Sequence, residues 1–143
     1  MAISTRNQLN ATVTAIQAGA SNDVIELTLA GGEKLAAVIT AESTHHLGLQ
    51  VGSPVVALFK APSVVLSTDD DLILSARNQL AATVVNINEG AVNTEVIVRT
   101  TGGVEIVAIL TQESVKNLAL AVNSSVKVIV KASHVLLGVK KAG

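Results

Sequence analysis

The sequence repeats itself once, at a constant offset of 71 residues. The block Ser-Thr-Arg-Asn-Gln-Leu at residues 4–9 returns as Ser-Ala-Arg-Asn-Gln-Leu at residues 75–80. The offset of 75 − 4 = 71 then holds without a gap, and roughly two in five positions match between residues 4–66 and 75–137. Such self-similarity indicates a tandem copy of one structural unit. We therefore predict two domains, residues 1–67 and 73–143, joined by a polar linker over residues 68–72.

The composition predicts a small β-protein with an aliphatic core. Hydrophobic residues make up 49% of the 143-residue chain, which has one Phe, no Tyr and no Trp. The core must therefore be built from Val, Ile, Leu and Ala, and Val and Ile favour strands. A single copy of the repeat is a marginal size for independent stability. We therefore expect much of its aliphatic surface to be buried against another copy or another chain.

Both copies show the same order of predicted elements. In the first copy, Ile25, Leu27 and Leu29 alternate with polar residues and predict one buried face of a strand, and the two glycines that follow predict a hairpin turn. A short helix is expected from Thr40 to about Leu49. The strands are expected over residues 7–17, 23–29, 34–39, 55–59 and 63–66. Five short strands with one helix after the third resemble an OB-type barrel, so the predicted fold class is mainly all-β, with two tandem OB-like five-stranded barrels that each carry one short helix.

Charge and residue usage exclude several function classes. The net charge is −1, and no charged block is long enough to indicate nucleic acid or an anionic membrane surface. Stacking of bases needs aromatic side chains, and Phe59 is the only one. Cysteine is absent, which excludes disulfides and thiol chemistry. Without repeated histidines or a paired acid and base, an enzyme is not expected. No apolar run approaches about 18 residues, so a cytoplasmic protein is predicted.

Three polar blocks occur in both copies, whereas much of the apolar sequence around them differs. Arginine offers a planar fork of donors and lysine a compact cation, while Thr40 and Ser43 fall at the N-cap and N3 positions of the predicted helix, where free backbone amides favour anions. The predicted oxyanion-binding residues are Ser4, Arg6, Asn7, Thr40, Ser43, Lys60 and Ala61 in the first copy, and Ser75, Arg77, Asn78, Thr111, Ser114, Lys131, Ala132 and Ser133 in the second.

This set consists almost entirely of hydrogen-bond donors, which constrains the anion. Phosphate carries a proton near pH 7 and requires an acceptor, whereas sulfate, molybdate and tungstate are fully deprotonated. A metal held as an oxyanion already has its oxygen ligands, so no side chain is expected to ligate metal directly. Each residue alone also fits a surface charge, a helix cap or an edge-strand lysine. Their occurrence in both copies favours one shared site, whereas His45, His46 and His134 occur in one copy each and are expected to be surface residues.

At these blocks the sequence resembles the molbindins, proteins built from Mop domains, and specifically their tandem, di-Mop type. The matching patterns are S-x-R-N-Q-L, I-T-x-x-S and K-A-S-x-V. The resemblance implies OB-like barrels in a homotrimer, with molybdate or tungstate bound at interfaces between barrels and no organic cofactor. One barrel would give Ser4 and Arg6, or Ser75 and Arg77. The neighbouring barrel would give Thr111, Ser114, Lys131 and Ala132, or Thr40, Ser43, Lys60 and Ala61, with both alanines acting through backbone N–H groups.

The resemblance implies a protein for intracellular molybdenum storage and homeostasis. The alternative is a molybdate-responsive regulatory or sensor module that acts through a separate partner protein. The two copies differ at one position of the third block, where Ser133 of the second copy corresponds to Pro62 of the first. Because proline has no N–H, unequal affinities are predicted among the sites.

Overall fold

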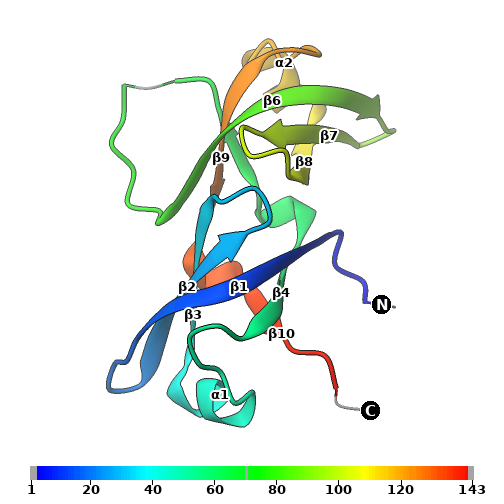
Figure 1. The fold of residues 1–143 in the computed structure, drawn as a ribbon. Helices are drawn as coiled ribbons and strands as arrows, with labels where there is room; N and C mark the ends of the chain where they lie inside the picture. Colours follow the sequence, from blue (N-terminus) through cyan, green and yellow to red (C-terminus); the bar gives the residue numbers. More distant parts are fainter. Residues whose placement is uncertain (1–2, 70, 142–143) are drawn as a thin grey trace.

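The computed structural model describes residues 3–69 and 71–141 as two five-stranded antiparallel sheets, each accompanied by a short helix (Figure 1). This arrangement confirms the predicted fold class. The first repeat contains β1 (Asn7–Gln17), β2 (Asn22–Leu29), β3 (Lys34–Thr40), α1 (Ala41–His46), β4 (Pro54–Phe59), η1 (Ala61–Ser63) and β5 (Val65–Ser67). The second contains β6 (Asn78–Glu89), β7 (Asn93–Thr100), β8 (Glu105–Thr111), α2 (Gln112–Asn117), β9 (Ser125–Val130), η2 (Ala132–His134) and β10 (Leu136–Gly138).

The two repeats exchange their last strands. The strand order is β10-β4-β1-β2-β3 in the first sheet and β5-β9-β6-β7-β8 in the second. Leu136 of β10 pairs with Leu58, and Val65 of β5 pairs with Ile129. Figure 1 shows β10, in red, beside β4 in the half of the molecule built from the first repeat. Each sheet therefore combines four strands of one repeat with the fifth strand of the other, so the repeat in the sequence differs from the unit in space.

Short 3₁₀ turns direct this exchange. The sequence predicts a strand from residue 63, but the 3₁₀ turn η1 occupies Ala61–Ser63 and β5 begins only at Val65. The turn η1 packs against β8, and η2 packs correspondingly against β3. Each turn thus lies on the opposite sheet and leads the chain into it. Of the predicted linker, residue 70 lies outside the described residues, while Leu72 and the adjoining Ile73 are exposed.

Strand alternation builds the aliphatic core. Ile25 and Leu27 of β2, and Val96 and Val98 of β7, are fully buried, as the period-two pattern predicts. Phe59, at the end of β4, is also buried. The register shifts in β1 between residues 13 and 15, and in β6 between residues 84 and 86. Such bulges bend a strand and increase its twist, which lets each sheet curl around its own core.

Two asparagine side chains close the edge strands β3 and β8. The Nδ2 of Asn78 donates to the carbonyl of Ala36 at 2.8 Å, and Oδ1 accepts from the Ala36 N–H. Asn7 makes the same pair of bonds with Val107 of β8, at 2.9 and 2.8 Å. We call each pair of bonds an amide bridge. Both asparagines are buried, and each satisfies backbone groups that an edge strand otherwise leaves unpaired.

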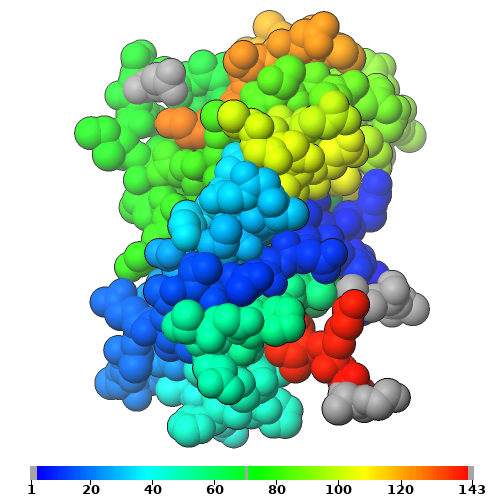
Figure 2. All heavy atoms as spheres, viewed as in Figure 1, coloured from blue at the N-terminus to red at the C-terminus, as the bar shows by residue number. Residues whose placement is uncertain are grey.

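The turn between β2 and β3 meets the turn between β7 and β8 where the two sheets approach each other. A Cβ built on Gly31 would lie 2.1 Å from the carbonyl oxygen of Gly102. Figure 2 shows the light-blue β2–β3 turn pressed against the yellow β7–β8 segment. Only a residue without a side chain permits this approach, so Gly31 allows the two turns to come into backbone contact.

We expect Asn78→Ala to lower the free energy of unfolding by about 2–4 kcal/mol, because it leaves two partly buried backbone groups of Ala36 without partners. Urea denaturation monitored by circular dichroism measures this loss. Asn10→Ala is the matched control, since Asn10 is exposed on β1. Equal stability of the two variants would contradict the structural role assigned to the amide bridge.

Candidate functional site

The strand register brings the arginine and the lysine of each repeat together. Asn7 pairs with Phe59, so the preceding Arg6 lies beside the following Lys60. Asn78 pairs with Val130, so Arg77 lies beside Lys131 in the same way. The first junction comprises Arg6, Lys60, Ala61, Pro62 and the facing strands β7 and β8. The second junction comprises Arg77, Lys131, Ala132, Ser133 and the facing strands β2 and β3.

The Ser-x-Arg-Asn-Gln block divides into architectural and exposed residues. The Nε2 of Gln8 donates to the carbonyl of Thr5 at 2.9 Å, and Gln79 does the same to Ala76 at 2.8 Å. The asparagine amides are engaged in the amide bridges, so the structure assigns Asn7 and Asn78 to holding the sheets together, a role that the sequence reading missed. The residues of the block left exposed are Ser4, Arg6, Ser75 and Arg77.

The Thr-x-x-Ser blocks cap the two helices, as the sequence predicts. Thr40 is the N-cap of α1: its hydroxyl accepts from the Ser43 N–H at 3.1 Å and donates to the Ser43 Oγ at 2.8 Å. Thr111 and Ser114 repeat this geometry at α2. Because the threonine hydroxyl is the donor in this bond, the serine hydroxyl keeps its own hydrogen for another acceptor.

Two details of the predicted helix need correction. The helix ends at His46 instead of continuing to about Leu49. Two of its first three amides are also not free, because the Ala41 N–H donates to the carbonyl of Ser21 at 2.9 Å and the Ser43 N–H is bound by the cap. The donors that this segment still offers are therefore the Ser43 hydroxyl and the Glu42 N–H, for which the described residues provide no partner.

The hydroxyl pairs stand at the ends of the strands that form the junctions. Thr111 ends β8, the strand that η1 and Asn7 contact. Arg6 reaches along this edge to Glu95, whose strand partner Ile109 lies only two residues before Thr111. One chain therefore brings an arginine, a lysine and a hydroxyl pair to the same strand edge. The grouping of Arg6 with Lys131 involves the other junction and stays a prediction for contacts between copies.

The third block forms the 3₁₀ turns. Ala61 and Ala132 are buried and occupy the first position of η1 and η2, where an amide N–H has no partner within the turn. Lys60 and Lys131 precede them and are exposed. The next residue is Pro62 in the first junction and the exposed Ser133 in the second. The second junction therefore offers one more N–H and one more hydroxyl than the first.

The two arginines differ in their partners. Arg6 Nη2 lies 2.7 Å from Glu95 Oε2, and the hydrogen bond from Arg6, with a smaller contribution from Asn88, lowers the pKa of Glu95 below its usual range. Glu95 therefore remains ionised near neutral pH. Within residues 3–69 and 71–141, Arg77 makes no ion pair.

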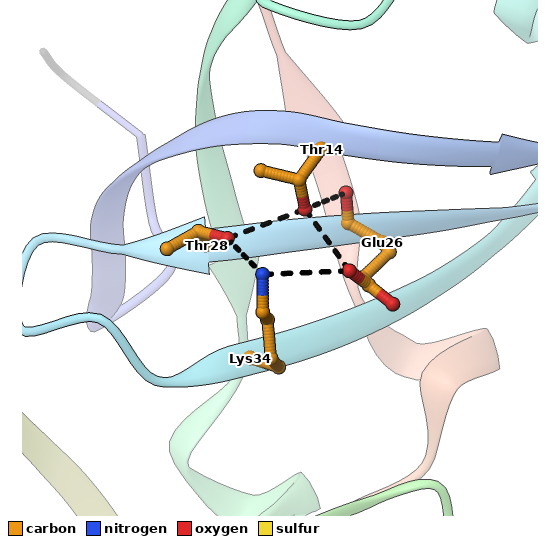
Figure 3. Close-up of polar contacts among 4 residues, drawn as sticks. All are labelled: Thr14, Glu26, Thr28 and Lys34. Atoms are coloured by element: carbon orange, nitrogen blue, oxygen red, sulfur yellow. Dashed lines mark hydrogen bonds and ion pairs between the residues drawn. The ribbon is translucent and has the colours of Figure 1, made fainter.

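A further polar cluster lies on the first sheet. Thr14, Glu26, Thr28 and Lys34 form a hydrogen-bonded cluster on β1, β2 and β3 (Figure 3), in which Lys34 Nζ donates to Thr28 at 2.8 Å and lies 3.5 Å from Glu26. Its charges are thus compensated internally. No group of three or more His, Asp or Glu side chains suited to a metal ion occurs in the described part of the chain.

One groove of the described surface contains none of the arginine, lysine and turn residues that define the junctions. It has a volume of about 1060 Å³ and runs between β1, β4 and the segment after β10, with Pro54, Val55 and Val139 among its lining residues. The described residues that line it include none of the predicted oxyanion ligands. The three histidines are exposed, as expected. None of the described helices has the length and apolarity required to cross a membrane.

Comparison with known proteins places this architecture in a family. The model of the TOBE domain matches residues 3–66 and again residues 74–137. The chain belongs to the TOBE-domain family. The tandem TOBE chain is 41% identical over 138 residues to the molybdenum-pterin-binding protein MopA of Rhodobacter capsulatus, with 96% of this chain and 52% of MopA covered. It is 38% identical over 139 residues to the molybdenum transport protein ModE of Azotobacter vinelandii, covering 97% and 52%.

A solved structure matches the tandem TOBE chain over its whole length. The crystal structure of the cytoplasmic molybdate-binding protein ModG with molybdate bound superposes with a TM-score of 0.94 and 48% identity, covering 98% of this chain and 100% of ModG. By contrast, the chain spans about half the length of the curated relatives MopA and ModE. The fold and the tandem arrangement are thus shared with a complete ModG chain.

We expect Pro62→Ser to strengthen oxyanion binding at the weaker class of sites about tenfold, because it restores an N–H and a hydroxyl toward a charged ligand. Isothermal titration with molybdate measures the two classes. Pro62→Ala separates the contributions, since it restores the N–H without the hydroxyl. A wild-type titration that fits one set of identical sites would contradict the predicted inequality.

Proposed function

We propose that this TOBE chain binds molybdate, and also tungstate, at the junctions between barrels and serves intracellular storage and homeostasis of molybdenum. The observation that carries the proposal is the similarity to ModG, at 48% identity with both chains covered almost completely. The junctions add a chemical reason, because they present cations, hydroxyls and turn amides. Such donors suit a dianion that has no proton of its own to donate.

The donors are assigned complementary roles. Arg77 and Lys131 supply charge at the second junction, and Arg6 and Lys60 at the first. The hydroxyls of Ser43 and Ser114 and the amides of the 3₁₀ turns complete the tetrahedral set of hydrogen bonds. Charge-assisted hydrogen bonds contribute about 1.5–3 kcal/mol each, so a few of them suffice for micromolar affinity. Capture needs no covalent step, and release follows the free concentration of the anion.

The proposed assembly is a homotrimer that completes the sites. Aliphatic side chains are exposed at equivalent positions of both repeats, as the offset of 71 shows: Val51 corresponds to Val122, and Val65 to Leu136. Val65 and Leu136 lie on the exchanged strands, which form sheet edges. Repeated exposure of apolar residues at an unpaired edge favours burial against other copies. The neighbouring copy then supplies donors from its own barrels to each site.

Native mass spectrometry combined with elemental analysis tests the proposal. We expect an assembly of three 14.6 kDa chains that retains molybdenum after growth with molybdate, and whose mass rises by whole molybdate units on titration. Tungstate should produce the same series, whereas phosphate should not. A chain that remains free of molybdenum at saturating molybdate would contradict the proposed function.

We expect Arg77→Ala to weaken molybdate binding at the sites that Arg77 lines by about tenfold or more, because a charge-assisted hydrogen bond to a dianion is lost. Arg99→Ala is the control with the same change in charge, since Arg99 pairs with Glu105 on the surface at 2.6 Å. Isothermal titration and thermal unfolding of both variants separate binding from folding. Equal weakening of molybdate binding by the two substitutions would show that the loss of affinity follows from the change in net charge and not from a contact between Arg77 and the anion.

A regulatory role is the second candidate, and one comparison favours it. The chain is 35% identical over 135 residues to the transcriptional regulator ModE of Yersinia pestis, covering 94% of this chain and 51% of that protein. In this role the loaded trimer would bind a separate partner protein. Affinity capture with and without molybdate distinguishes the roles, because only a sensor retains a partner in a molybdate-dependent manner.

A further inference from the structure

The ion pair between Arg6 and Glu95 joins the two barrels at the first junction. Glu95 belongs to β7, and its side chain is 25% exposed, whereas that of Arg6 is 50% exposed. Asn88, on the neighbouring strand β6, donates to Glu95 Oε1 at 3.2 Å. Both carboxylate oxygens therefore have a partner, and the carboxylate is held in front of the guanidinium.

The second junction has no equivalent carboxylate. The offset of 71 relates Glu95 to Val24 of β2. The same offset relates the two amide bridges, since Val107 corresponds to Ala36. The strands facing Arg6 and Arg77 are thus placed equivalently, and Val24 occupies the position that Glu95 holds. Both residues are partly exposed.

The nearest acidic residue on the face of β2 that carries Val24 is already engaged. Glu26 lies two residues beyond Val24 and interacts with Lys34 and Thr14, as Figure 3 shows. Its counterpart in the second repeat is Ile97. The two repeats therefore differ at the position that faces an arginine. The second repeat holds Glu95 there, which pairs with Arg6, whereas the first repeat holds Val24.

We propose that Glu95 sets the affinity of the first junction by acting as a built-in competitor for Arg6. The inference rests on the proposed function. A carboxylate presents to a guanidinium the same kind of paired oxygen acceptors as a tetrahedral oxyanion, and its negative charge repels a dianion at the same place. Molybdate must displace Glu95 from Arg6, after which Asn88 still holds the carboxylate. Among the described residues, Arg77 pairs with no carboxylate, so the second junction fills first.

The test exchanges the two residues. Glu95→Val copies the second junction into the first, and Glu95→Gln removes the charge while keeping the shape. Isothermal titration with sodium molybdate at fixed pH and ionic strength should show the weaker class of sites tightened by at least about threefold in both variants. The tighter class should remain unchanged.

Val24→Glu is the reciprocal variant, which places a carboxylate opposite Arg77. It should weaken the tighter class and leave the weaker class unchanged. Thermal unfolding and native mass spectrometry without molybdate establish that all three variants fold and assemble. A role of Glu95 in stability alone would change the melting temperature without this reciprocal, class-specific shift.

The possible failures are distinguishable. If wild type binds molybdate but the two Glu95 variants leave both classes unchanged, the competitor role is wrong and the proposed function stands. If the Glu95 variants weaken binding, Glu95 positions Arg6 for the ligand instead of competing with it. Absence of molybdate binding in the wild-type protein overturns the proposed function and the inference together.

Discussion

The amide bridges of Asn7 and Asn78 are the contacts on which the remaining architecture depends. Each sheet ends in a strand whose outer N–H and C=O groups need partners, and one asparagine amide supplies a donor and an acceptor with the spacing of a strand. Because the arginine immediately precedes the asparagine in the sequence, the bridge also delivers a cation to that edge. The contact that pairs the edge strand therefore also places the arginine of the junction.

Strand exchange explains why the chain carries two copies of the repeat. Without β10, strand β4 of the first sheet would have no partner on its outer side, and β9 would lack one without β5. A single repeat therefore cannot complete its own sheet in this arrangement. The covalent link supplies the missing strand at high effective concentration, and it fixes the orientation of the 3₁₀ turns that carry Lys60 and Lys131.

Much of the fold could be predicted because alternation is a local signal. The burial of Ile25 and Leu27 and the capping by Thr40 follow from period-two patterning and from hydroxyl chemistry. The exchange could not be predicted in this way, because β5 and β10 are three residues long and their hydrophobic pattern is the same in either sheet. The amide bridges could not be predicted for a similar reason. A sequence reveals a donor group, but it does not reveal whether that group binds the backbone or a ligand.

The repeat in the sequence identifies shared donors but not the groups that oppose them. Arg6 and Arg77 occur in both copies, whereas the counterpart of Glu95 is Val24. The Pro62–Ser133 difference is visible in the sequence, but Glu95 is found only when the structure shows what faces each arginine. This explains why the shared donors were predictable and the carboxylate opposing one of them was not.

Duplication within one chain makes such differences possible. In an assembly of identical single repeats, a substitution at the junction would change every site at once. Here the first junction holds Pro62 and Glu95, whereas the second holds Ser133 and Val24. Both differences reduce the donor capacity of the first junction, one by removing an N–H and the other by occupying a guanidinium. Two independent substitutions with the same chemical direction favour a graded pair of sites, in which one class fills at low anion concentration and the other provides capacity as the concentration rises.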